Sequence, residues 1–187
     1  MLKRVTVLFV ALSGAPVLHG QASATASRSG DAQLGAGYTS AASDYGTRFS
    51  GFMAYGDFDF SSHFGVEANF HYVDAPSPSV LYEKTYEIGA RYFRTYGPFV
   101  PYGKVMVGRG VFNYPPCPNG PINVACANLG YNMYALGIGT DIKVRRWLYV
   151  RGDFEYQEWP GFKGTINGDS NGLTPELFSI GAAYHFR

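Results

Sequence analysis

The sequence predicts an all-β protein, an eight-stranded antiparallel up-and-down transmembrane β-barrel. Apolar and polar residues alternate in segment after segment, and the connections between these segments alternate between short and long. After the N-terminal stretch there is no apolar run long enough for a membrane-spanning helix. Aromatic residues make up 17% of the chain and charged residues 16%. This composition suits strands whose side chains meet a lipid–water interface.

The first residues have the organisation of a secretory signal peptide. Lys3 and Arg4 precede an apolar stretch over residues 5–18, and small residues follow it. This order matches a positive region, an apolar region and a cleavage site, so we expect export through the general secretory pathway with cleavage between Ala24 and Ala26. The expected organisation is a signal peptide over 1–24, a short tail over 25–30 and a barrel over 31–187.

The alternation is clearest in the segment over residues 147–157. Leu148, Val150 and Phe154 share one parity, whereas Arg151 and Asp153 share the other. Because successive side chains of a strand point to opposite faces, this segment has one apolar and one charged face. The same reasoning predicts strands near residues 32–38, 47–60, 63–72, 86–92, 104–111, 134–142, 147–157 and 178–186. Short connections are expected near 61–62, 97–98 and 144–146, and long ones near 39–46, 74–81, 114–129 and 161–173.

We expect the apolar parity to face lipid and the polar parity to face the interior. The polar parity is rich in Gly, Ala and Ser, which suits eight strands whose interior is only just wide enough for side chains. Arg109 falls on the apolar parity and is expected to extend toward the headgroups. Aromatic residues near strand ends predict two interfacial girdles. Their members are Tyr72, Tyr82, Tyr92, Phe112, Tyr131, Tyr156 and Trp159.

The polar parity would bring ionisable side chains into the interior. Burying such charges without partners is costly, so we expect them to pair across the lumen and to fix the register of the strands. The alternative interpretation is an ion path. The predicted network contains Glu67, Glu87, Arg91, Lys104, Arg151, Asp153 and Glu155, with Asp141, Asp57 and Asp59 beside them.

The sequence predicts no catalytic, cofactor or metal site. His63, Glu67 and His71 share one parity, but a spacing of four residues is about 13 Å along a strand, too far for one metal ion. His185 lies on the inward parity beside Phe186 and has no serine partner of the kind found in outer-membrane deacylases. The near balance of acidic and basic residues also gives no indication of nucleic-acid binding.

The connection over residues 113–128 is the strongest candidate for contact with a partner. It contains four prolines together with Cys117 and Cys126. An exported chain meets an oxidising compartment, so we expect these cysteines to form a disulfide. A stiffened loop suits contact with another surface, although the same residues would also serve merely to connect two strands.

The end of the chain carries the most specific motif. Residues 179–186 read SIGAAYHF, in which Gly181, Tyr184 and Phe186 match the C-terminal assembly signal of outer-membrane barrels. Arg187 departs from that pattern, which normally ends on the aromatic residue. With the other features, residues 31–187 resemble the outer-membrane β-barrel family typified by the OmpA transmembrane domain and the opacity-type, porin-like barrels.

The resemblance implies the fold and a place in the bacterial outer membrane, in contact with lipid and lipopolysaccharide. It also implies insertion by the barrel assembly machinery, but it does not specify an activity. The favoured hypothesis is a non-enzymatic barrel that serves envelope integrity or surface contact through its outer loops. Alternatives are an outer-membrane lipid-modifying or proteolytic enzyme, a narrow ion pore, and a soluble exported barrel that binds an apolar ligand.

Overall fold

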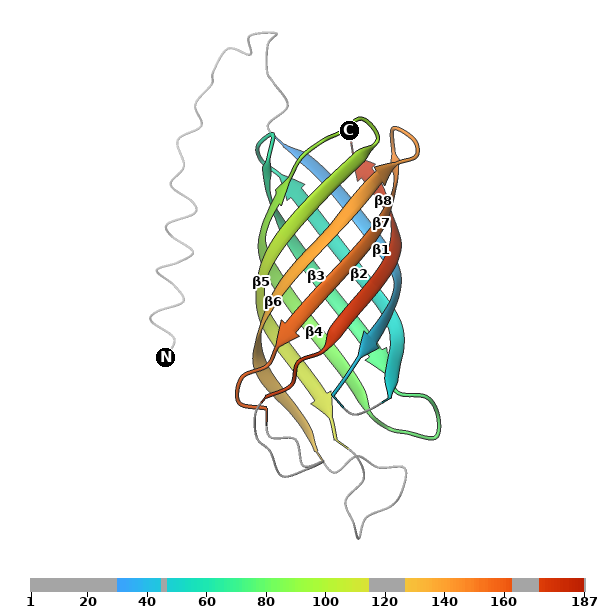
Figure 1. Cartoon of the computed structure of the whole chain (residues 1–187), viewed down its shortest axis with the longest axis vertical. Coiled ribbons are helices and arrows are strands. Elements are labelled where there is room, and N and C mark those ends of the chain that lie inside the picture. The colour runs from blue at the N-terminus through green and yellow to red at the C-terminus, as the bar shows by residue number, and fades with distance from the viewer. Residues whose placement is uncertain (1–29, 45–46, 115–126, 163–171, 187) are drawn as a thin grey trace, which may run out of the picture.

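Eight antiparallel strands close into one barrel, in which each strand pairs with its sequence neighbours and β1 pairs with β8 (Figure 1). The computed structural model describes residues 30–44, 47–114, 127–162 and 172–186. This topology confirms the predicted fold class. The strands are β1 (Asp31–Ala42), β2 (Arg48–Asp59), β3 (Phe64–Asp74), β4 (Tyr82–Phe93), β5 (Phe99–Asn113), β6 (Asn128–Lys143), β7 (Leu148–Glu158) and β8 (Glu176–Phe186).

Several strands are longer than the sequence pattern indicated. The predicted connection over residues 39–46 is wrong in its first half, because Thr39 pairs with Gly51 and Ala42 pairs with Arg48. Residues 39–42 also pair with β8. This stretch reads TSAA and lacks apolar alternation, so only its pairing with strands on both sides places it in the barrel wall.

The connections divide the barrel into two ends. The short-turn end carries the connections over 60–63, 94–98 and 144–147, together with residues 30 and 186, where the barrel begins and ends. The long-loop end carries the connections over 43–47, 75–81, 114–127 and 159–175. The expected signal peptide, Cys117, Cys126 and Arg187 all lie outside the described residues.

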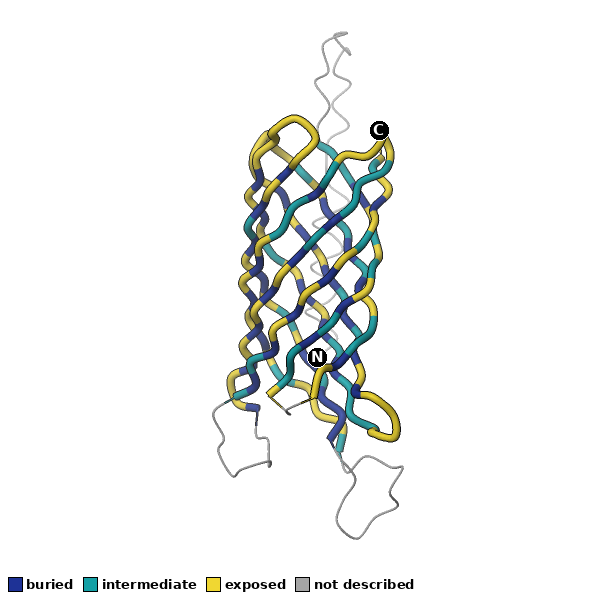
Figure 2. The backbone as a smooth tube through the Cα atoms, turned by 45° about the vertical axis from the view of Figure 1, so that its right-hand side comes forward, coloured by how far each residue is buried: buried dark blue, intermediate teal, exposed yellow. Residues whose placement is uncertain are grey.

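Buried and exposed residues alternate along every strand (Figure 2). The exposed residues are the apolar ones: Ile88, Leu136 and Ile138 are 60%, 62% and 66% exposed, whereas Arg151 is 1% exposed. A soluble barrel that binds an apolar ligand would have the opposite arrangement, so that alternative is excluded. The described residues contain no helix with the length and apolar character needed to cross a membrane.

Two interior glycines allow close approach of neighbouring strands. A Cβ atom on Gly89 would collide with the Val105 carbonyl oxygen, and one on Gly37 would collide with the Ile180 carbonyl oxygen. Because these obstacles are backbone atoms, rotation of a side chain cannot relieve the collision. The small residues of the polar parity therefore let the strands pack around a narrow interior.

Substitution Gly89→Ala is expected to lower the free energy of unfolding by about 1–3 kcal/mol, because the added methyl group forces backbone displacement in a packed interior. Gly152→Ala is the matched control, since a Cβ there has no neighbour within 4 Å. Urea titration of both variants in detergent micelles measures the difference. Equal stabilities would show that the close approach at Gly89 has no energetic consequence.

Candidate functional site: the polar interior of the barrel

Arg151 of β7 lies at the centre of the polar interior. Its guanidinium group contacts Asp57 at 2.5 Å, Asp141 at 2.7 Å and Glu67 at 3.1 Å. Arg91 of β4 contacts Asp57 and Asp141, each at 2.5 Å. We call Arg91, Arg151, Asp57 and Asp141 the guanidinium cluster. It connects β2, β4, β6 and β7 across the lumen, so it ties together strands that are not all neighbours in the wall.

Three uncharged side chains support the guanidinium cluster. The Gln33 amide donates hydrogen bonds to Asp57 and, at 3.1 Å, to Asp141. The Tyr55 ring lies 3.8 Å from the Arg151 guanidinium carbon, and the Tyr102 ring lies 4.3 Å from that of Arg91. A planar guanidinium group stacks on aromatic rings while its edge binds carboxylates, which suits arginine to a dry interior.

Lys104 of β5 forms a second centre. Its ammonium group lies 2.9 Å from Glu67, 3.1 Å from Asp153 and 3.0 Å from Glu155. The Tyr102 hydroxyl donates a hydrogen bond to Asp153. Glu67 therefore joins Lys104 to the guanidinium cluster, and the ionic contacts form one continuous network.

His71, Glu87 and Glu155 form a third group, which we call the histidine–glutamate cluster. One ligand atom of each residue lies within 4.8 Å of those of the other two. Gln157 donates hydrogen bonds to Glu155 at 2.7 Å and to Glu87 at 2.9 Å. Because Glu155 also contacts Lys104, this cluster continues the network toward the long-loop end.

Apolar residues fill the interior next to the long-loop end. We call this region the apolar plug, and two packed groups of buried residues form it. Leu81 packs against both groups, and the Trp159 indole donates a hydrogen bond to Gln157 at 3.0 Å. The apolar plug therefore lies directly on the polar network. Its residues are Ala41, Phe49, Val73, Ala75, Met106, Phe112, Tyr114, Met133, Ala135, Trp159, Phe162, Leu173 and Leu177.

The short-turn end is open above the guanidinium cluster. A cavity of about 70 Å³ reaches Arg91 and Asp141, and Asp31, Asp59 and His185 line it nearer the mouth. His185 lies 3.1 Å from Asp31, and its ring stacks on Tyr149 at 4.8 Å. The cavity holds little more than a few water molecules, so the described side chains block a continuous path through the barrel.

The structure brings together the ionisable residues of the predicted network, and Asp57 and Asp141, which were expected beside them, lie at its centre. Asp59 lies half-buried near the mouth. The parity predicted that His63 would share the interior with His71, and this is wrong. His63 is exposed in the turn before β3, with its ring 6.2 Å from the Tyr92 ring. The reason is that β3 begins at Phe64, so strand alternation does not extend to His63.

The girdle prediction is wrong for three residues. Phe112 and Trp159 are fully buried in the apolar plug, and the half-buried Tyr131 packs against that plug, whereas Tyr92 and Tyr156 are exposed on the outer surface. Phe112 has the parity of Lys104, and Trp159 has the parity of Arg151. The alternation therefore already indicated an inward direction, and proximity to a strand end was the weaker signal.

Other residues lie where the alternation put them. Arg109 faces outward and donates a hydrogen bond to the Gly130 carbonyl oxygen at 3.2 Å. In β8, Gly181 faces inward opposite Gly37, and Tyr184 and Phe186 face outward with their rings 5.1 Å apart. The predicted network did not include Gln33, Tyr55, Tyr102 or Gln157, although each has the inward parity of its strand.

Comparison with known proteins indicates which fold the chain shares. No protein-family model matches the sequence, and no curated protein matches it. Among solved structures, Neisserial surface protein A is 13% identical with a TM-score of 0.60, covering 85% of this chain and 98% of that one. OprG of Pseudomonas aeruginosa is 14% identical with a TM-score of 0.58, covering 86% and 97%.

Ail of Yersinia pestis, solved in complex with the heparin analogue sucrose octasulfate, is 16% identical with a TM-score of 0.56, covering 85% of this chain and 100% of that one. Identities this low show a shared fold and do not transfer a function. The chain has the fold of small eight-stranded outer-membrane barrels.

Substitution Arg151→Met is expected to lower the free energy of unfolding by about 3–5 kcal/mol, because it leaves buried carboxylates without their partner. Arg146→Ala, in the exposed turn before β7, is the control and is expected to change stability by less than about 0.5 kcal/mol. Urea unfolding in micelles, followed by tryptophan fluorescence, compares the two. An unchanged free energy of unfolding in Arg151→Met would contradict a structural role for the guanidinium cluster.

Proposed function

We propose that this chain is an integral outer-membrane barrel with a non-enzymatic role in envelope integrity or surface contact. One observation carries the proposal: the outer surface is a continuous apolar belt, while the ionic network and the apolar plug fill the interior. Soluble monomers rarely expose large contiguous apolar patches. A lipid bilayer is the environment in which this belt is solvated, and a closed barrel leaves no strand edge unpaired within it.

Basic residues near the long-loop end support contact with anionic lipid. Lys84 lies on the outer surface with its ammonium group 4.7 Å above the Tyr82 ring, and Arg109 faces outward on the neighbouring strand β5. Arg48 is exposed at the start of β2. In outer-membrane barrels the long loops face the exterior, so these bases would lie at the leaflet whose lipopolysaccharide carries phosphate groups.

The four connections of the long-loop end are the proposed contact surface. Their sequences contain Asp44, Lys163 and Asp169 as their charged residues and are otherwise rich in Pro, Gly, Asn, Ser and Thr. This composition favours a neutral partner that is recognised by hydrogen bonds and apolar contact. A sulfated polysaccharide requires clustered bases, so the heparin analogue bound by Ail is not carried over to this chain.

Export and assembly complete the proposal. Residues 1–24 would direct secretion, Cys117 and Cys126 would form a disulfide that stiffens the loop over 113–128, and Gly181, Tyr184 and Phe186 would be read by the barrel assembly machinery. The alternation and outward aromatic rings of β8 are consistent with that last role.

The interior contacts argue against the pore and enzyme alternatives. An ion path would have to cross the guanidinium cluster, whose side chains are 1% exposed, and then the apolar plug. The Ser62 hydroxyl lies 2.8 Å from His63 in the exposed turn. No carboxylate lies within ion-pair distance of His63 in the described part of the chain, so this pair lacks the group that would orient a catalytic base.

Substitution Leu136→Arg places a charge at the middle of β6 on the apolar belt and is expected to lower the free energy of unfolding in lipid by about 2–4 kcal/mol. Val144→Arg, in the turn at the short-turn end, is the control and should leave stability unchanged. Both variants are refolded into vesicles and titrated with urea. Equal stability of the two variants would contradict the assignment of this surface to the membrane.

Replacement of residues 115–126 by a Gly/Ser linker of equal length is expected to abolish surface contact while the barrel still assembles. Cell adhesion and resistance to detergent are measured in cells expressing either form, and heat-modifiable gel mobility of the outer-membrane fraction verifies folding. A linker variant with unchanged adhesion and unchanged envelope resistance would contradict a role for this loop.

A further inference from the structure

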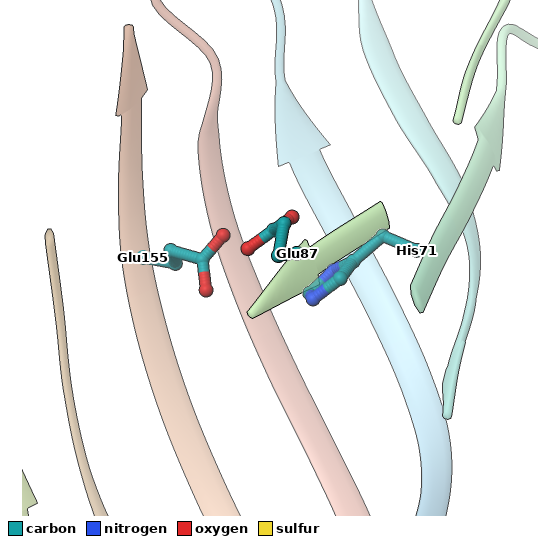
Figure 3. A group of neighbouring side chains, drawn as sticks. All are labelled: His71, Glu87 and Glu155. Carbon is teal, nitrogen blue, oxygen red and sulfur yellow. The ribbon is translucent and has the colours of Figure 1, made fainter. Parts of the chain in front are cut away.

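The histidine–glutamate cluster brings together three potential metal ligands from three strands. His71 projects from β3, Glu87 from β4 and Glu155 from β7, and the three side chains converge inside the barrel (Figure 3). One ligand atom of each lies within 4.8 Å of the other two. Side chains from both walls of the lumen therefore point to one place, although sequence spacing gave no indication of it.

The polar atoms of this cluster are incompletely satisfied. Neither ring nitrogen of His71 has a hydrogen-bond partner in the described part of the chain, although the residue is 1% exposed. Oε2 of Glu87 also lacks a partner. Buried polar atoms normally have partners, and each exception requires an explanation such as an ion. Here the unpartnered atoms belong to residues whose side chains converge on one point.

Neighbouring residues donate hydrogen bonds to the carboxylates of Glu87 and Glu155. Gln157 donates to Oε1 of Glu87 and to Oε1 of Glu155, and the Thr85 hydroxyl donates to the same oxygen of Glu87. The Trp159 indole donates to Gln157 and fixes the direction of its amide. These bonds orient the carboxylates, as outer residues do around metal ligands, and leave Oε2 of Glu87 unused.

The charge of the interior also favours a cation. Among the described residues, the buried ionisable groups include seven carboxyl groups but, besides His71, only three basic side chains, Arg91, Lys104 and Arg151. The guanidinium cluster uses both arginines, so Lys104 is the base that contacts Glu155. In the described part of the chain no lysine or arginine forms an ion pair with Glu87, whose hydrogen-bond donors are the neutral Thr85 and Gln157.

We propose that His71, Glu87 and Glu155 bind one divalent transition-metal ion, of which Zn²⁺ fits best. One imidazole nitrogen with two carboxylate oxygens is a ligand set typical of zinc, with a water molecule in the fourth position. Ca²⁺ and Mg²⁺ prefer oxygen ligands alone, and the nitrogen ligand disfavours them.

The geometry requires only a small adjustment. Bonds of about 2.0–2.2 Å in a tetrahedral site separate ligand atoms by roughly 3.5 Å, and the present ligand atoms lie within 4.8 Å of one another. Side-chain rotation covers that difference. The bound ion would connect β3 and β4 to β7 on the far wall, so it acts as a structural crosslink. Because the apolar plug lies beside the site, the ion would enter while the barrel folds.

A proton shared between Glu87 and Glu155 is the competing explanation for the paired carboxyl groups. The substitution Glu87→Gln distinguishes a shared proton from a metal site. Its amide oxygen can still accept from Thr85 and Gln157, and its amide group can donate to Glu155, so the barrel keeps its hydrogen bonds. A shared proton makes this variant equivalent to the natural protein, whereas a metal site loses a ligand.

The test refolds the full mature barrel in micelles with ZnCl₂, removes free metal and measures zinc per chain by mass spectrometry. The natural protein, Glu87→Gln, His71→Gln and the matched control His63→Gln are compared, with CaCl₂ in a parallel series. One zinc per chain is expected in the natural protein and in His63→Gln, with loss in the other two. Zinc should also raise the urea midpoint of the natural protein and of His63→Gln, but not of the other two variants, because a ligand that binds only the folded state stabilises that state.

Gel mobility shows which variants fold. If His71→Gln does not fold, the zinc content of Glu87→Gln decides the question. Co²⁺ in place of Zn²⁺ should give visible absorption bands of a tetrahedral nitrogen–oxygen site in the natural protein. The proposal is overturned if the natural protein binds no stoichiometric zinc, if Glu87→Gln retains it, or if His63→Gln loses it. Equal retention of calcium and zinc would likewise refute a transition-metal site.

Discussion

Charge compensation inside a narrow closed wall is the constraint on which this structure depends. Eight strands leave space only for side chains, so a buried charge must find its partner within that space. Arg151 meets this requirement with three carboxylates from β2, β3 and β6. Arg91 and Lys104 likewise form ion pairs with buried carboxylates elsewhere along the barrel axis. Apart from Arg151–Asp141, which lies across the paired strands β6 and β7, each of these ion pairs joins strands that backbone pairing does not join, so the ionic network stiffens the barrel across its diameter.

The two chemical layers of the interior have different consequences. Ionic pairs fill the part toward the short-turn end, and aromatic and aliphatic residues fill the part toward the long-loop end. Trp159 and Gln157 connect the layers through one hydrogen bond. A filled interior leaves the outer surface and the loops as the accessible regions of the molecule, and this supports the proposed contact role over transport.

Buried polar atoms without a partner also occur on Tyr55, Asp57 and Arg91, but in the histidine–glutamate cluster such atoms belong to residues whose side chains converge on one point. Around Arg151 nearly every donor meets a carboxylate at ion-pair distance. Around His71 the ring nitrogens have no partner in the described residues, and Glu87 has only neutral donors. The convergence of these side chains makes the local deficit informative, and the position of the cluster between the ionic network and the apolar plug protects it from solvent.

The sequence by itself determined that there are eight strands and on which face most of their side chains lie, because a strand alternates its side chains with a period of two. That period also placed Phe112 and Trp159 inside, against the expectation of a girdle. Which inward residues meet was decided only by the tertiary structure. Strand tilt, register and closure of β1 on β8 bring Glu155 to His71 and Arg151 to Asp57. These pairs are distant along the chain, and no local pattern encodes the distance between opposite walls of a barrel.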